Sequence, residues 1–121
     1  ALDVPRIALA IPIVAPYGLA GEEVLTALTL SPQRVYGENV GQAASFFLTG
    51  QVPVALVSLS YALGPLADTP QTTVPADLHA PIRQAAVLLP ASPAARAFWD
   101  YLFSPEAQAQ LIAAGYESPA P

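Results

Sequence analysis

The stretch RIALAIPIVAPYG, residues 6–18, decides the fold of this chain. It begins with the apolar run RIALAI, which is typical of a buried strand in a parallel sheet, and Pro12 and Pro16 end that strand. Gly18 then opens a helical stretch that extends to residue 30. The apolar residues of this stretch fall near helical spacing: Leu19, Val24, Leu25 and Leu28. A buried strand followed by an amphipathic helix predicts the first half of a βαβ unit.

The same apolar run also has features of the hydrophobic segment of a signal peptide, because residues 7–15 follow Arg6. Asp3 and Pro12 fit that interpretation poorly, and a patterned domain follows directly. We therefore interpret the run as a buried strand, and we expect no signal peptide within these residues.

Strand and helix signals alternate along the rest of the chain. We expect a strand at residues 34–36, a helix from Val40 to about residue 49 with Asn39 as its N-cap, and a strand at residues 54–58. The further expected elements are a short helix at 60–63, a polar loop at 66–75, a strand at 82–89, and two helices that Ser92 and Ser104 cap, each with a proline at its first position. This order predicts an α/β fold, with an open βαβαβ sheet in residues 1–90 and a helical segment in residues 91–121.

The composition excludes several classes of function. The chain has 121 residues, enough for one domain, and it has no cysteine, which excludes disulfides, thiolate metal sites and cysteine nucleophiles. Four arginines against nine carboxylates leave a net charge of −5, so we expect no nucleic-acid binding. Although 54% of the residues are hydrophobic, 14 prolines interrupt the apolar runs, so we expect no membrane insertion.

Candidate catalytic residues are few. His79 is the single histidine and lies in a loop, where a lone histidine is usually solvated or caps a helix. Glu22 and Glu23 are neighbours in sequence and do not face one site, so we interpret them as surface charges. Ser58 and Ser60 have no general base close in sequence and no nucleophile-elbow pattern around them. We therefore expect no enzyme activity, no metal site and no cofactor.

Two helix starts are candidates for binding an anion. The first N–H groups of a helix have no partner within the helix and lie at the positive end of its dipole, so they hold a small oxyanion without a basic side chain. The candidates are APYG at residues 15–18 and GENVG at residues 37–41, each directly after an expected strand. Most strand-to-helix turns bind nothing, so their spacing alone leaves this function open.

Longer stretches of the chain resemble a known family. IALAIPIVAPYG at residues 7–18, VYGENVGQAASFFLTG at 35–50 and ALVSLSYALGP at 55–65 resemble the periplasmic molybdate-binding proteins of ABC importers. The pair APYG and GENV is the most specific part of this resemblance. The ending SPAARAFWDYLFSPEAQAQLIAAGY is similar to that of many type II substrate-binding proteins, so it indicates only the wider superfamily.

The resemblance implies a type II periplasmic binding protein fold, in which a tetrahedral oxyanion lies between two α/β lobes. The positions that match the family's contacts are Tyr17 and Val40, whose backbone N–H groups would bind the ligand, with Gly18 and Asn39 beside them. Ser58 matches a position that carries a tyrosine in some members. The implied ligand is molybdate or tungstate, the implied partner is the permease of an ABC importer, and the implied location is the periplasm.

The chain departs from this family in its length and its polarity. Full-length members are much longer, so the resemblance implies the second lobe, a returning crossover strand and C-terminal helices that would dock on the first lobe. With half of the ligand shell, we expect weak oxyanion binding. The C-terminal helices carry an apolar surface that needs a partner, which predicts a homo-dimer or a domain-swapped oligomer: Phe98, Trp99, Leu102, Phe103, Leu111 and Ile112. Two alternatives stay open, namely a self-associating structural lobe without a ligand, and a related lobe for another ligand.

Overall fold

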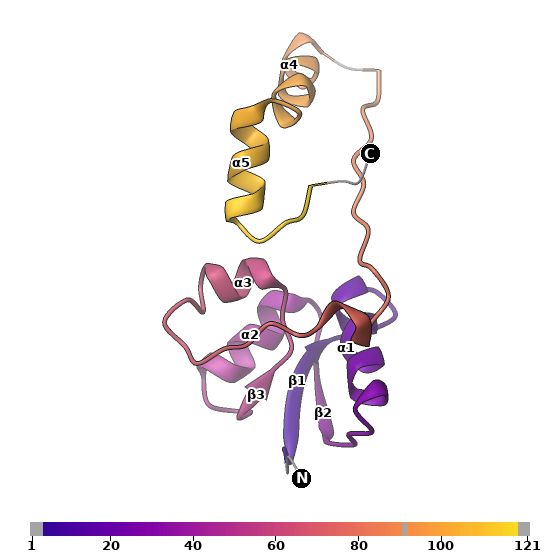
Figure 1. Cartoon of the computed structure of the whole chain (residues 1–121), viewed down its shortest axis with the longest axis vertical. Helices are drawn as coiled ribbons and strands as arrows, with labels where there is room; N and C mark the ends of the chain where they lie inside the picture. The colour runs from indigo at the N-terminus through magenta and orange to yellow at the C-terminus, as the bar shows by residue number, and fades with distance from the viewer. Residues whose placement is uncertain (1–3, 91, 119–121) are drawn as a thin grey trace. The chain divides into compact units, whose positions relative to one another are not determined.

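The computed structural model describes residues 4–90 and 92–118, and the chain divides between Ile82 and Arg83 into two compact units. The first unit holds a parallel sheet with its helices, and the second holds two helices (Figure 1). Among the described helices, none is both long enough and apolar enough to cross a membrane.

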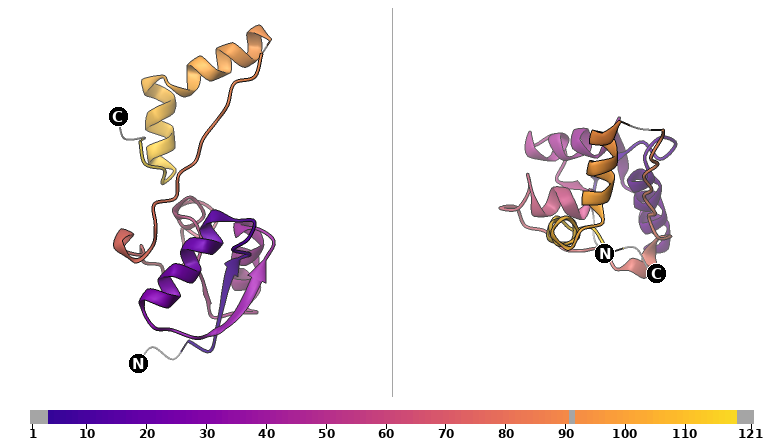
Figure 2. Two further views of the ribbon diagram at one scale, coloured as in Figure 1. Left: turned by 90° about the vertical axis from the view of Figure 1, so that its right-hand side faces the viewer. Right: turned by 90° about the horizontal axis from the view of Figure 1, so that it is seen from above.

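The sheet of the first unit has three parallel strands in the order β2-β1-β3. They are β1 (Arg6–Ala10), β2 (Gln33–Gly37) and β3 (Val54–Ala55). The chain crosses from β1 to β2 on one side and then returns past β1 to β3 on the other. Right-handed crossovers therefore place α1 (Pro16–Ala27) and α2 (Val40–Leu48) on opposite faces of the sheet (Figures 1 and 2).

Alternation of side chains along β1 divides the core between these two faces. Ile7 and Leu9 pack with Leu25 of α1, whereas Ala8 packs with Ala43 of α2. Leu9 and Leu25 are the largest fully buried side chains among the described residues. Phe46 and Phe47 of α2 also pack against the cluster around Ala8. The apolar run at residues 6–11 thus lies at the centre of the core.

Three of the described helix starts have the side-chain caps that their sequence predicts. The caps are Asn39 to the N–H of Gln42 at 2.9 Å, Ser92 to that of Ala95 at 3.3 Å, and Ser104 to that of Ala107 at 3.2 Å. They begin α2, α4 (Pro93–Leu102) and α5 (Pro105–Ala113). The other short helices are α3 (Leu59–Leu63) and the 3-10 turn η1 (Ala76–Leu78).

One strand prediction is too long and another is wrong in the described structure. The strand expected at residues 54–58 ends at Ala55. Residues 82–89 are not in a strand, and Val87 and Leu89 are 80% and 72% exposed. An apolar run becomes a strand only where a neighbouring strand completes its hydrogen bonds, and no described strand pairs with this run.

Candidate anion-binding site

The candidate site residues lie after the carboxyl ends of the three strands. Because the strands are parallel, these ends meet at one edge of the sheet (Figure 1). Tyr17 and Gly18 follow β1, Asn39 and Val40 follow β2, and Ser58 follows β3. The N–H of Ile11 donates to the carbonyl of Gly37 at 2.9 Å, which joins the ends of β1 and β2. The fold therefore brings all five residues to the same edge.

The connection from β1 to α1 contains a close contact between backbone atoms. Pro16 begins α1 and has no N–H, so Tyr17 carries the first amide of the helix. Gly18 is buried, and a Cβ at this position would lie 2.1 Å from the carbonyl oxygen of Ala10. The N–H of Gly18 donates to the carbonyl of Ala15 at 2.9 Å. Gly18 thus allows the first turn of α1 to pack on the end of β1. Its own N–H is already engaged in the hydrogen bond to Ala15.

The connection from β2 to α2 ends in a reciprocal cap. The Asn39 side chain accepts from the N–H of Gln42 at 2.9 Å, and the Gln42 side chain accepts from the N–H of Glu38 at 2.6 Å. Val40 and Gly41 are the first residues of α2, and no acceptor within the described residues pairs with their N–H groups. Two such donors at the positive end of a helix dipole suit a small anion.

The segment after β3 contributes a buried hydroxyl. Ser58 is 6% exposed and is the N-cap residue of α3. Its Oγ lies 2.9 Å from the Oγ of Ser60, and either hydroxyl donates in this hydrogen bond. Because the bond uses one of the two hydroxyl protons, the pair retains one proton for another acceptor.

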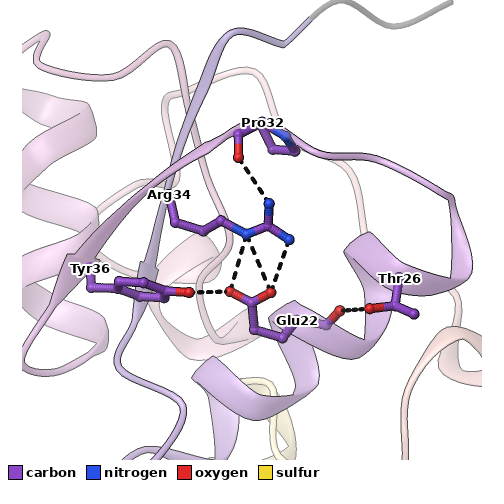
Figure 3. A network of polar contacts seen from close by, with 5 residues as sticks. All are labelled: Glu22, Thr26, Pro32, Arg34 and Tyr36. Carbon is purple, nitrogen blue, oxygen red and sulfur yellow. Dashed lines mark hydrogen bonds and ion pairs between the residues drawn. The ribbon is translucent and has the colours of Figure 1, made fainter.

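Glu22 and Glu23 are partly buried and each holds a partner within the fold, which corrects their interpretation as surface charges. Glu22 pairs with Arg34, whose Nη2 lies 3.1 Å from Oε2, and the Tyr36 hydroxyl donates to Oε1 at 2.6 Å (Figure 3). Glu23 accepts the N–H of Ala80 at 2.7 Å. These partners lie at least 12 residues away in sequence, so the local pattern does not indicate them.

The network around Glu22 connects α1 to β2 and neutralises a cation. Burial raises the pKa of Glu22, but hydrogen bonds from Arg34 and Tyr36 and the charge of Arg34 outweigh it, so the pKa lies below its ordinary value. The hydrogen bond to Glu22, followed by burial, raises the pKa of Tyr36 above its ordinary value. Because Arg34 is engaged in this pair, its charge is compensated within the fold.

His79, the single histidine, contacts the backbone next to it in sequence. The Nδ1 of His79 lies 2.8 Å from the carbonyl oxygen of Ala80, which is a local contact with the backbone. In the part of the chain that the structure describes, no three His, Cys, Asp or Glu side chains gather in a group that could hold a metal ion.

Residues 1–117 match the family model of the bacterial extracellular solute-binding proteins. The chain belongs to this family. The molybdate-binding protein ModA of Rhodobacter capsulatus is 40% identical to it over 121 residues, and that of Azotobacter vinelandii is 40% identical over 120 residues. These alignments cover 94% and 92% of this chain, and 48% of each relative. The chain therefore spans about half the length of the curated relatives it matches.

A solved structure has the same fold as this chain. The periplasmic molybdate-binding protein of Azotobacter vinelandii matches with a TM-score of 0.85 at 33% sequence identity. The match covers 99% of this chain and 57% of that chain. The type II periplasmic binding protein fold, expected from the α/β pattern and the resemblance, is therefore confirmed.

Tyr61 of α3 is a residue near the candidate site that the sequence pattern does not single out. A Cβ at Gly41 would lie 2.5 Å from the Tyr61 hydroxyl oxygen, so this hydroxyl lies against the first turn of α2. Gly41 and Tyr61 belong to helices that follow different strands, and no local motif connects them. Their contact is visible only once the sheet has placed both helices.

Proposed function

We propose that this chain is the oxyanion-binding part of a substrate-binding protein for molybdate or tungstate. The observation that carries the proposal is the meeting of two helix starts, APYG and GENV, at one sheet edge in a chain 40% identical to two molybdate-binding proteins. The same relationship supports a periplasmic location and the permease of an ABC importer as the partner. The chain acts by binding and has no enzymatic step in this proposal.

Neutral donors explain how a chain with a net charge of −5 binds an anion. The N–H groups of Val40 and Gly41 lie at the positive end of the α2 dipole, and each hydrogen bond to a charged oxygen contributes about 1.5–3 kcal/mol. Tyr17 and its turn provide the second helix start, at the end of β1. Because these donors are fixed by the backbone, they also select for anion size, which separates molybdate from the smaller sulfate.

Binding by the 121-residue chain alone is weak in this proposal. All of its candidate donors come from one sheet edge, so an oxyanion bound there keeps water on its open side. The hydrogen bonds of this edge must still offset the cost of association. We therefore place the affinity of the chain in the roughly millimolar range.

The experiment replaces Val40 with proline. Proline removes the N–H of Val40 and is favoured at the first position of a helix, as α1, α4 and α5 of this chain already show. The extended backbone of Asn39, with φ −153° and ψ 174°, suits a residue before proline. We expect Val40→Pro to weaken molybdate and tungstate binding about tenfold or more, measured from amide chemical shifts in an NMR titration.

Val40→Ala is the matched control, because it shortens the same side chain and keeps the N–H. It should bind within about twofold of the parent chain, and sulfate should shift the same amides less than molybdate does. The proposal is wrong if molybdate leaves the amides of Val40 and Gly41 unshifted, or if Val40→Pro binds as well as Val40→Ala.

Self-association is the second candidate function, and the exposed apolar surface of the second unit favours it. Phe98 and Phe103 are 62% and 60% exposed, and Val87 on the preceding segment is exposed as well. Val87 and Phe98 line one hollow of the second unit, and an exposed apolar surface of this kind suits a second copy of the chain. Light scattering after size exclusion should give the mass of a dimer, and Phe98→Asp should give a monomer. A monomer of the parent chain at high concentration excludes this candidate.

A further inference from the structure

The first turn of α2 carries a glycine with a specific neighbour. A Cβ at Gly41 would lie 2.5 Å from the hydroxyl oxygen and 3.3 Å from the Cζ of Tyr61, and 3.2 Å from the Oδ1 of Asn39. An alanine at this helical position would favour the helix by about 1 kcal/mol. The absence of a side chain at Gly41 therefore has a use, which is to admit the hydroxyl of Tyr61 beside the helix start.

The hydroxyl of Tyr61 joins a group of donors, and the two side-chain oxygens nearby each accept one backbone N–H. The Asn39 side-chain oxygen already accepts from Gln42, and the Gln42 side-chain oxygen already accepts from Glu38. The N–H groups of Val40 and Gly41 find no acceptor among the described residues. A phenol O–H beside two such N–H groups is complementary to the oxygens of a small anion.

We propose that the Tyr61 hydroxyl donates a hydrogen bond directly to the oxyanion at the start of α2, and that Gly41 is required for its approach. This inference rests on the proposed function and names a residue that sets the affinity of that site. Tyr61 reaches the helix start from α3, after β3, so the ligand would contact segments that follow two different strands.

The test is a double-mutant cycle on the full 121-residue chain, with molybdate titrated against amide chemical shifts. Tyr61→Phe keeps the ring and removes the hydroxyl, and it should weaken binding about tenfold or more. Gly41→Ala should weaken binding by a similar factor, because the new methyl group displaces the hydroxyl. The double variant should bind no more weakly than Tyr61→Phe alone, because the group that the methyl displaces is already absent. Tyr101→Phe, in the second unit, is the control and should leave binding unchanged.

The outcomes separate this inference from the function on which it rests. If molybdate shifts no amides of the parent chain, the proposed function fails, and this inference fails with it. If the parent chain binds and Tyr61→Phe binds within about twofold of it, only the inference about Tyr61 is overturned. If Gly41→Ala weakens binding as strongly in the Tyr61→Phe chain as in the parent, the role given to Gly41 is overturned. Unchanged shifts of β1 amides in each variant without ligand show that the fold is retained.

Discussion

Gly18→Ala tests the contact by which α1 packs on the central strand. The added Cβ would lie 2.1 Å from the carbonyl oxygen and 2.7 Å from the carbonyl carbon of Ala10. Both atoms belong to the backbone of β1, which is held on both sides by β2 and β3. A rotamer change cannot relieve this contact, so the helix and the strand must separate.

The magnitude follows from a comparison with Gly21→Ala in the same helix. A Cβ at Gly21 would meet the side-chain ends of Leu9 at 3.2 Å and Leu56 at 3.4 Å, which can move by a few tenths of an ångström. Both variants gain about 1 kcal/mol of helix propensity, so that gain cancels between them. Overpacking costs about 1–3 kcal/mol, and a contact with rigid backbone belongs at the upper end. We expect Gly18→Ala to be less stable than Gly21→Ala by about 2–3 kcal/mol.

Amide hydrogen exchange is the appropriate measurement, because it reports on the first unit separately from the second. The N–H of Ile11 donates to Gly37 and the N–H of Leu56 donates to Ala8, so both amides are protected only while the sheet is intact. Their exchange should be faster in Gly18→Ala and nearly unchanged in Gly21→Ala. Equal protection in the two variants would refute the assignment of Gly18 as a close-contact glycine.

The remaining predictions concern the network of Glu22 and the cap of α2. Because the folded pKa of Glu22 lies below its ordinary value, the pair with Arg34 adds stability above that ordinary value and loses it as the pH falls through the folded pKa. The pair is partly exposed, so we expect about 1 kcal/mol, seen in thermal unfolding as an acid-side loss that Glu22→Gln lacks. Asn39→Ala should lower the free energy of unfolding by about 1 kcal/mol in urea denaturation, whereas Asn39→Asp keeps an accepting oxygen and should stay close to the parent.

The sequence predicts those parts of the fold that depend on local chemistry. Asn39, Ser92 and Ser104 cap the helices that follow them, as predicted. Such caps can be predicted because a capping side chain reaches only the N–H groups of the first turn of its own helix. The first strand is also predicted, because a continuous apolar run is buried on both faces whichever strands pair with it. These features need no knowledge of distant segments.

The parts that the sequence does not predict depend on segments that meet only in the folded chain. Residues 82–89 have the composition of a strand, but a strand also needs a neighbour, and no described strand pairs with them. Glu22 looks like a surface charge until the packing of α1 on the sheet places it beside Arg34 and Tyr36 (Figure 3). Tyr61 becomes a neighbour of the candidate site in the same way, through the position of α3.

Two glycines at the same sheet edge have different uses, and this difference can be measured. Gly18 allows the start of α1 to contact the end of β1, so its substitution should reduce stability. Gly41 faces the side-chain atoms of Tyr61 and Asn39 rather than backbone, so its substitution should cost less stability than that of Gly18 and should reduce anion affinity. The edge of a parallel sheet therefore serves both the fold and the proposed ligand, and stability and affinity measured on the same two variants separate these contributions.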